Sequence, residues 1–396
     1  MNKCKAFFEE NKTKIGNISL LAAIFILTFG CWNEISWYDV MAPLGTLISF
    51  VFLLVTFACY ANVRLLYKDV FFYMMLAGDI AALVNIFIIG SGIGAFFTAA
   101  DLLMVLYLAD KIVLPKKILY AAGMYIAFFF YYWTFDIKGY FKGYNTNYGG
   151  LVLITGFAFA IMMLLILREY LLGREKKRWA LLLSLFIAFM FAWGLNIISW
   201  YRARCALIGL IMIALIMLIP RKIWKLRWIY SLLVFFSTLG AIIISIVYVF
   251  LGAIKDSINI QIFYKDILSG RDEIWSELWL AFFKHPLTGI GSNYVMKLEW
   301  MDGMFEVHNG LLDILIVHGL IVFALCCIML IVRLWKVRES VTSSLVGKSA
   351  LAGLMAMLVS SFMENFFIVP PFTLCFLMLF VFINSLGKTG ILEVNG

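Results

Sequence analysis

The chain has 396 residues, a formal net charge of +9 and a large excess of apolar over charged side chains. Hydrophobic residues make up 64% and charged residues only 14%, whereas soluble domains carry about 25% charged residues. Such a chain cannot cover a water-facing surface, which argues against a soluble enzyme or a nucleic-acid-binding domain. Apolar runs of membrane-spanning length recur along the sequence. We therefore expect an all-α, polytopic transmembrane protein.

The apolar runs predict about twelve spans in a single transmembrane domain, residues 1–396. The expected spans are 15–33, 41–61, 69–89, 92–109, 116–135, 148–169, 179–197, 201–220, 228–253, 310–334, 348–368 and 370–387. The longest polar segment, residues 255–309, separates the ninth span from the tenth. We expect this segment to form one large external loop.

The positions of lysine and arginine predict the orientation of the spans. Nine of the 32 fall in segments expected to face outward: Lys138, Lys142, Arg202, Arg204, Lys255, Lys265, Arg271, Lys284 and Lys297. Short loops rich in positive charge stay in the cytoplasm. Both termini are therefore expected in the cytoplasm, and 255–309 on the outer side of the cytoplasmic membrane. The net charge would then face anionic lipid and not nucleic acid.

The external segment contains a predicted amphipathic helix at the membrane interface. Ser269 and Asp272 have the spacing of a capping box. Two apolar rows follow at i, i+4 spacing: Ile274, Leu278 and Phe282, then Trp275, Trp279 and Phe283. Pro286 is expected to end the helix. Gly289 and Gly291 then allow a tight turn or a close backbone approach to a ligand.

Candidate functional residues are arginines and a histidine at the outer ends of spans. Arg202 and Arg204 lie at the mouth of an apolar helix, where charge is costly unless it faces a wet cavity or an anion. Arg271 either reaches lipid phosphate or binds a substrate pyrophosphate. His308 is either structural or catalytic. No Asp-x-Asp pair or His/Cys cluster indicates a metal, so we expect no cofactor, with cations in place of a metal.

Three carboxylates are expected within spans. Asp79 and Asp101 flank the Gly90-Ser91-Gly92 turn at similar distances. They are either functional or a hydrogen-bonded structural pair. Glu364, near the outer end of the eleventh span, could bind a sugar or orient an arginine.

Four motifs in order resemble the O-antigen ligase and polymerase family. They are Arg204-Cys205-Ala206-Leu207, Gly270-Arg271 with Trp275, His285-Pro286-Leu287-x-Gly289-x-Gly291, and His308-Asn309 followed by Gly319-Leu320. The resemblance implies a metal-independent, inverting glycosyltransferase that takes a glycan from undecaprenyl pyrophosphate. It maps the motif arginines onto Arg204 and Arg271 and the motif histidine onto His308. Ala203 departs from the serine or threonine that often precedes the first arginine, so Arg202 is a possible substitute.

This resemblance leads to a hypothesis for the reaction. Arg204 and Arg271 would hold the pyrophosphate, and His308 would accept or orient the proton of the acceptor hydroxyl. The expected substrate-binding residues are Arg202, Trp275, Asn309 and Glu364. The expected partners are the lipid-linked oligosaccharide, membrane lipid, a chain-length regulator and a flippase.

Two alternatives accompany the preferred function. We prefer a polymerase of O-antigen or capsular polysaccharide, because short external segments leave little room for a lipid A core. A ligase that moves the glycan to lipid A core has the same motifs. A polysaccharide transporter that uses Asp79, Asp101 and Glu364 is the alternative from another class; it would tolerate loss of Arg271 and His308.

Overall fold

The computed structural model describes residues 2–30, 38–135, 146–255, 261–262 and 265–386, and nearly all regular structure in them is helical. The α-helices are α1 (Asn2–Gly30), α2 (Tyr38–Tyr60), α3 (Val70–Ile89), α4 (Ile93–Leu108), α5 (Lys116–Phe135), α6 (Thr146–Gly173), α7 (Lys177–Tyr201), α8 (Arg204–Leu218), α9 (Arg221–Trp224), α10 (Arg227–Thr238), α11 (Gly240–Gly252), α12 (Arg271–Phe282), α13 (Gly310–Ser343), α14 (Leu345–Ser360) and α15 (Phe372–Leu386). Short 3-10 helices cover Val63–Lys68 and Glu299–Met301. The strands described are the two-residue antiparallel pair β1 (Gln261–Ile262) and β2 (Lys265–Asp266). The predicted all-α class is confirmed.

Helices lie at all the expected span positions, but they differ in length. Within the described ranges, five are long and apolar enough to cross a membrane: parts of α1, α3, α6, α7 and α13. α10 and α11 form a sixth if this pair, bent by 58°, is one span. The apolar parts of α2, α4, α8, α14 and α15 are shorter. The number of crossings, about twelve, and their orientation therefore stay predictions.

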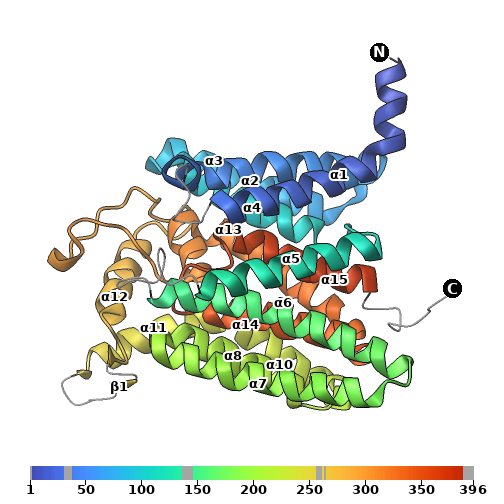
Figure 1. Ribbon diagram of the computed structural model, residues 1–396. Coiled ribbons are helices and arrows are strands. Elements are labelled where there is room, and N and C mark those ends of the chain that lie inside the picture. Colours follow the sequence, from blue (N-terminus) through green and yellow to red (C-terminus); the bar gives the residue numbers. More distant parts are fainter. Residues whose placement is uncertain (1, 31–37, 136–145, 256–260, 263–264, 387–396) are drawn as a thin grey trace.

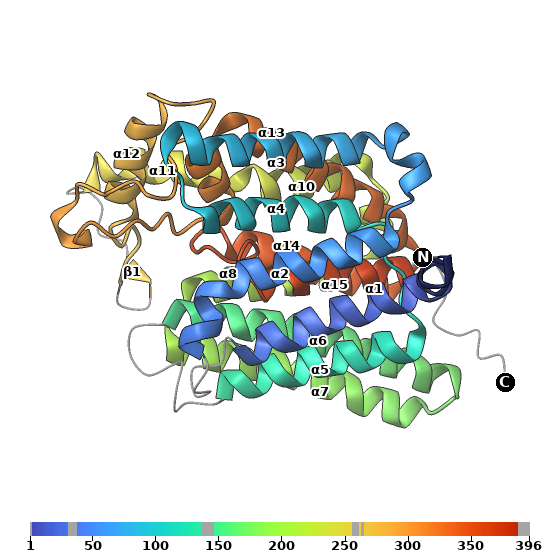
Figure 2. The same ribbon diagram turned by 90° about the horizontal axis from the view of Figure 1, so that it is seen from above.

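The helices run side by side, and the predicted external segment lies at one end of them (Figures 1 and 2). α12 and the loops around it gather at that end. α1 begins, and α15 ends, at the opposite end (Figures 1 and 2). This arrangement puts residues 265–309 across the ends of the helices rather than along their sides.

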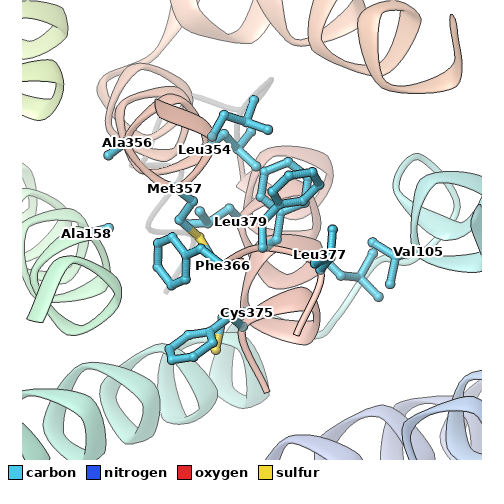
Figure 3. Packing of buried hydrophobic residues seen from close by; sticks show 14 of the residues in the cluster. Val105, Ala158, Leu354, Ala356, Met357, Phe366, Cys375, Leu377 and Leu379 are labelled. Atoms are coloured by element: carbon cyan, nitrogen blue, oxygen red, sulfur yellow. The ribbon is translucent and has the colours of Figure 1, made fainter. Parts of the chain in front are cut away.

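The interior is built around α14 and α15. α14 packs against α6, α8, α13 and α15, and its residues from Val346 to Ser360 are all buried. Figure 3 shows Leu377 of α15 beside Val105 of α4, and Met357 of α14 beside Leu379 of α15. A helix that is apolar on all sides belongs inside a bundle. α7, by contrast, exposes large apolar side chains such as Phe189, as a lipid-facing helix does.

α13 is broken at Gly319, whose φ of 81° and ψ of 177° are not helical. The break frees backbone groups, and residues 286–291 bind them. Ile290 N–H donates to the carbonyl of Ile316 (2.8 Å), and Gly291 N–H donates to that of Val317 (3.2 Å). Leu320 N–H in turn donates to the carbonyl of Pro286 (2.9 Å). Each of these groups would cost several kcal/mol if unpaired in an apolar setting, so this segment is part of the helix packing.

The glycines of this segment make that contact possible. A Cβ at Gly289 would lie 2.6 Å from the carbonyl oxygen of Ile316, and a Cβ at Gly319 would lie 2.2 Å from that of Leu287. Both glycines have positive φ, 75° and 81°, which side chains disfavour. The close approach expected at Gly289 is therefore to the backbone of α13 and not to a ligand.

α12 confirms one apolar row and corrects another. Ile274, Leu278 and Phe282 are buried, as predicted. In the second row, Trp275 is buried and Phe283 is 69% exposed, because α12 packs against α11 and α13. This packing also buries Asp272.

Candidate functional site

Three predicted residues meet at the end of the helices where α12 lies. Arg271 is the first residue of α12, His308 precedes α13, and Glu364 lies in the turn that follows α14. Glu364 Oε2 is 2.8 Å from His308 Nδ1, and Glu364 Oε1 is 3.8 Å from Arg271 Nη2. The three side chains are 15%, 23% and 8% exposed, in the order Glu364, His308 and Arg271. Charge interactions are stronger in such a partly buried group than in water.

Glu364 reaches this position because α14 ends earlier than predicted. The expected span 348–368 is helical only to Ser360. The turn beyond it is closed by Ser361 Oγ, which donates to the carbonyl of Glu364 (3.0 Å). The carboxylate therefore projects from a turn, where it contacts two other segments, and not from a membrane span.

Arg271 keeps part of its guanidinium group unpaired. Nη2 donates to the carbonyl of Met363 (2.7 Å), in the same turn as Glu364. Nε is buried and has no hydrogen-bond partner among the described atoms. A buried N–H without a partner is unusual, and here it offers a donor for an anionic ligand.

Arg204, at the start of α8, binds the chain just before α12. Nη1 donates to the carbonyls of Asp266 (2.7 Å) and Ile267 (3.3 Å), and Nη2 donates to Ser269 Oγ (2.5 Å). No ion pair involves Arg204 in the described residues. The charges of Arg204 and Arg271 are close enough to repel each other, and Tyr248 lies near both arginines. A bound anion would relieve this repulsion.

Ser269 has a different role from the predicted helix cap. The N-cap of α12 is Gly270, with φ of 78° and no side-chain cap bond. Ser269 Oγ accepts from Arg204 and donates to the carbonyl of Asp266 (2.8 Å). The hydroxyl therefore fixes Arg204 beside the start of α12.

Asn309 caps α13, and its predicted role in substrate binding stays a prediction. Its side-chain oxygen accepts from Leu312 N–H (3.1 Å), and its amide nitrogen donates to the carbonyl of Ala241 (2.9 Å). Its own N–H donates to Asn365 Oδ1 (2.9 Å). Asn309 is fully buried, so it holds His308 in place. His308 has a φ of 53°, a conformation that non-glycine residues adopt only when the surroundings enforce it.

Trp275 also bonds within the protein, and its predicted contact with substrate stays a prediction. The side chain is completely buried, and Nε1 donates to the carbonyl of Val307 (2.8 Å). Its ring lies 5.1 Å from that of Tyr248. Arg202 ends α7 on the exposed surface with φ of 55°, and it is Arg204 that contacts residues 266–269.

Glu306 is a member of the group that the motifs did not single out. Its Oε1 lies 3.3 Å from His308 Nδ1. Donor atoms of Glu306, His308 and Glu364 all lie within 4.8 Å of one another, a set that could hold a cation. Residues two apart in extended chain face the same side, which was the available signal. The expected absence of a metal stays a prediction.

Asp79 and Asp101 belong to a separate part of the molecule. They lie on the paired helices α3 and α4. Asp101 is fully buried, and neither carboxylate oxygen has a hydrogen-bond partner among the described atoms. The hydrogen-bonded pair favoured from the sequence is therefore not formed.

These features define a helical membrane protein with a site of arginine, histidine and glutamate at one end. The family model for O-antigen ligase matches residues 189–327, which include Arg204, Arg271 and His308. This match supports the resemblance to the O-antigen ligase and polymerase family that the motifs predict. Members are membrane enzymes that act on lipid-linked glycans. No curated protein and no solved structure matches the chain.

Proposed function

We propose that the protein is a polymerase of O-antigen or capsular polysaccharide. It transfers a glycan from undecaprenyl pyrophosphate to an acceptor sugar hydroxyl at the outer face of the cytoplasmic membrane. One observation carries the proposal: Glu364 lies 2.8 Å from His308 and 3.8 Å from Arg271. His308, the proposed proton acceptor, and Arg271, the proposed cation for the leaving group, therefore lie close to the same carboxylate.

The two arginines serve the leaving group. The bond between the anomeric carbon and the pyrophosphate oxygen breaks, and the electron pair leaves with the oxygen. Arg271 offers its unpaired Nε–H, and the partners of Arg204 are carbonyls and a hydroxyl. Charge developing on the pyrophosphate is thus stabilised by two guanidinium groups placed in advance, without a metal ion.

His308 serves the acceptor. Its Nδ1 contacts the Glu364 carboxylate, so Nε2 is free to take the proton of the acceptor hydroxyl. The acceptor oxygen attacks the anomeric carbon from the side opposite the pyrophosphate and inverts its configuration. Glu364 fixes the ring orientation and stabilises the protonated imidazole, as an acidic partner does for other catalytic histidines.

Short external turns support a polymerase over a ligase. α7 and α8 are joined by Arg202 and Ala203, and α3 and α4 by Gly90, Ser91 and Gly92. Apart from residues 265–309, the described chain thus offers little surface to bind a lipid A core. A ligase remains the second candidate, because the matching family model carries that description.

Product analysis in a strain that lacks the gene separates the two functions. Loss of a polymerase leaves single repeat units on their acceptor. Loss of a ligase leaves long polymer on the carrier lipid. Purified protein given only lipid-linked repeat units should lengthen them. If it acts only when lipid A core is added, the polymerase assignment is wrong.

A further inference from the structure

A second polar site lies at the other end of α13. A cavity of about 750 Å³ is lined by the ends of α4, α13 and α15 and by the residue that follows α9. Its charged and amide residues include Asp110, Lys225, Arg333, Lys336, Arg338 and Asn384. From His308 to Arg333, α13 extends on the order of 35 Å, so this cavity is separate from the candidate active site.

The cavity carries an excess of positive charge. Four cations line it, against the carboxylates of Asp110 and Glu339. Asp110 pairs with Arg333 and with Lys336 (3.1 Å). Lys225 and Arg338 form no ion pair within the described chain. An anion would therefore find two cations that no carboxylate neutralises.

The cations are held in place by the backbone. Arg338 Nε donates to the carbonyl of Trp224 (3.2 Å), and Arg338 Nη2 donates to that of Lys225. Arg333 donates to the carbonyls of Leu106 (2.7 Å) and Tyr107 (3.0 Å). Positive groups fixed in this way lose little side-chain freedom when an anion binds.

The lining of the cavity also includes apolar residues. Ala109, Val337, Phe380 and Ile383 line it, and so does Trp335, which is 38% exposed. The apolar helices α4 and α15 end at this level, where a membrane would give way to water. Tryptophan is enriched at that boundary. The cavity thus combines cationic and apolar lining residues, a combination that suits an amphiphile.

We propose that this cavity binds the phosphate headgroup of an anionic phospholipid. Lys225, Lys336 and Arg338 contact the phosphate, Arg333 stays bonded to Asp110 and the backbone, and the apolar lining residues contact the glycerol and the first acyl carbons. A free phosphate ion is also an anion but would leave the apolar lining residues without a partner. The lipid is therefore the occupant that fits the whole lining. Basic pockets between membrane helices bind anionic headgroups in this manner.

The test titrates the purified full-length protein with phosphatidylglycerol and, separately, with phosphatidylcholine, with binding followed by native mass spectrometry. Phosphatidylglycerol should bind more tightly. The double variant Lys225→Gln/Lys336→Gln should weaken its binding about 30-fold, since each lysine contributes about 1 kcal/mol near anionic lipid. Lys222→Gln/Arg227→Gln, which removes the same charge nearby but outside the cavity, should have little effect.

Three results would overturn the proposal. Equal losses in the two double variants would mean diffuse attraction to the surface. Equal binding of the two lipids would remove the requirement for an anionic headgroup. Displacement of phosphatidylglycerol by inorganic phosphate at similar concentration would assign the cavity to a soluble anion. Melting temperatures of both variants establish that they are folded.

Discussion

Two buried arginines, Arg271 at the start of α12 and Arg333 in the later part of α13, are bonded differently. Arg333 donates to two carbonyls and pairs with Asp110. Arg271 donates to one carbonyl, lies 3.8 Å from Glu364 and has an unpaired Nε. An arginine whose guanidinium nitrogens all have partners stabilises the fold, whereas one with an unpaired nitrogen keeps a donor for a ligand. The difference separates an anchor from a functional group without any appeal to sequence motifs.

The largest expected effect is at His308. His308→Ala should lower the rate of glycan transfer on the order of 10³-fold, because it removes the proposed proton acceptor. His285→Ala is the matched control, since His285 is an exposed histidine that directly precedes residues 286–291. Purified variants are compared by single-turnover transfer, with protein levels checked by immunoblot. A His308→Ala enzyme with normal transfer would contradict the proposed mechanism.

Lysine substitutions test the two arginines directly. Arg271→Lys should lower transfer about 100-fold with little change in melting temperature, because lysine lacks Nε–H and the planar fork. Arg333→Lys should do the reverse, lowering the melting temperature while transfer per folded molecule is kept. Calorimetry and rate measurements on both variants decide the matter. Identical behaviour of the two would abolish the distinction between anchor and functional group.

Carboxamide substitutions rank the two carboxylates beside His308. Glu364→Gln should reduce transfer about 30-fold, since it keeps the shape but weakens stabilisation of the protonated imidazole. Glu306→Gln should have a smaller effect, because Glu306 lies farther from Nδ1, at 3.3 Å against 2.8 Å. The pH dependence of transfer should shift in Glu364→Gln. An unchanged pH profile would mean that Glu364 only supports the backbone.

Glycine substitutions test the break in α13 at Gly319. Gly319→Ala should destabilise the protein by about 2 kcal/mol or more. The new Cβ would lie 2.2 Å from the carbonyl oxygen of Leu287, and residue 319 has a positive φ. Gly94→Ala in α4 is the control, because a Cβ there meets nothing within 4 Å. Thermal unfolding in detergent measures both. Equal melting temperatures would show that the contact of 286–291 with α13 is not stabilising.

The smallest expected effect is that of metal removal. A chelator should change the transfer rate less than about two-fold, because two guanidinium groups serve the leaving group. Glu306, His308 and Glu364 make the experiment necessary, since their donor atoms are close enough to share a cation. Loss of activity on chelation, restored by a divalent metal, would replace the metal-independent mechanism with one that uses this set.

The sequence predicted the helix positions and the resemblance to the O-antigen ligase model, because both depend on local pattern. Long apolar runs specify helices, and the ordered motifs around Arg204, Arg271 and His308 carry the resemblance. A contact of Glu364 with an arginine was among the expectations, whereas its simultaneous contact with His308 was not predictable. It depends on α14 ending at Ser360, although the apolar sequence continues, so composition alone extended the span too far.

Residues beside the motifs were harder to assign. Asn309 and Trp275 neighbour reactive residues, and proximity in sequence made them candidates for substrate binding. In the structure their polar atoms are used by the backbone: Asn309 caps α13, and Trp275 binds the carbonyl of Val307. The break at Gly319 also gave no signal, because single glycines are tolerated in apolar helices.

The hydrogen bonds between 286–291 and α13 have a consequence for the dynamics of the external segment. A loop at the end of a helical bundle would ordinarily exchange its amide protons with solvent quickly. The amides of Ile290 and Gly291 instead donate to carbonyls of a membrane helix. They should therefore exchange with deuterium as slowly as the amides of α13 itself. Any motion that admits a substrate must then leave this stretch in place.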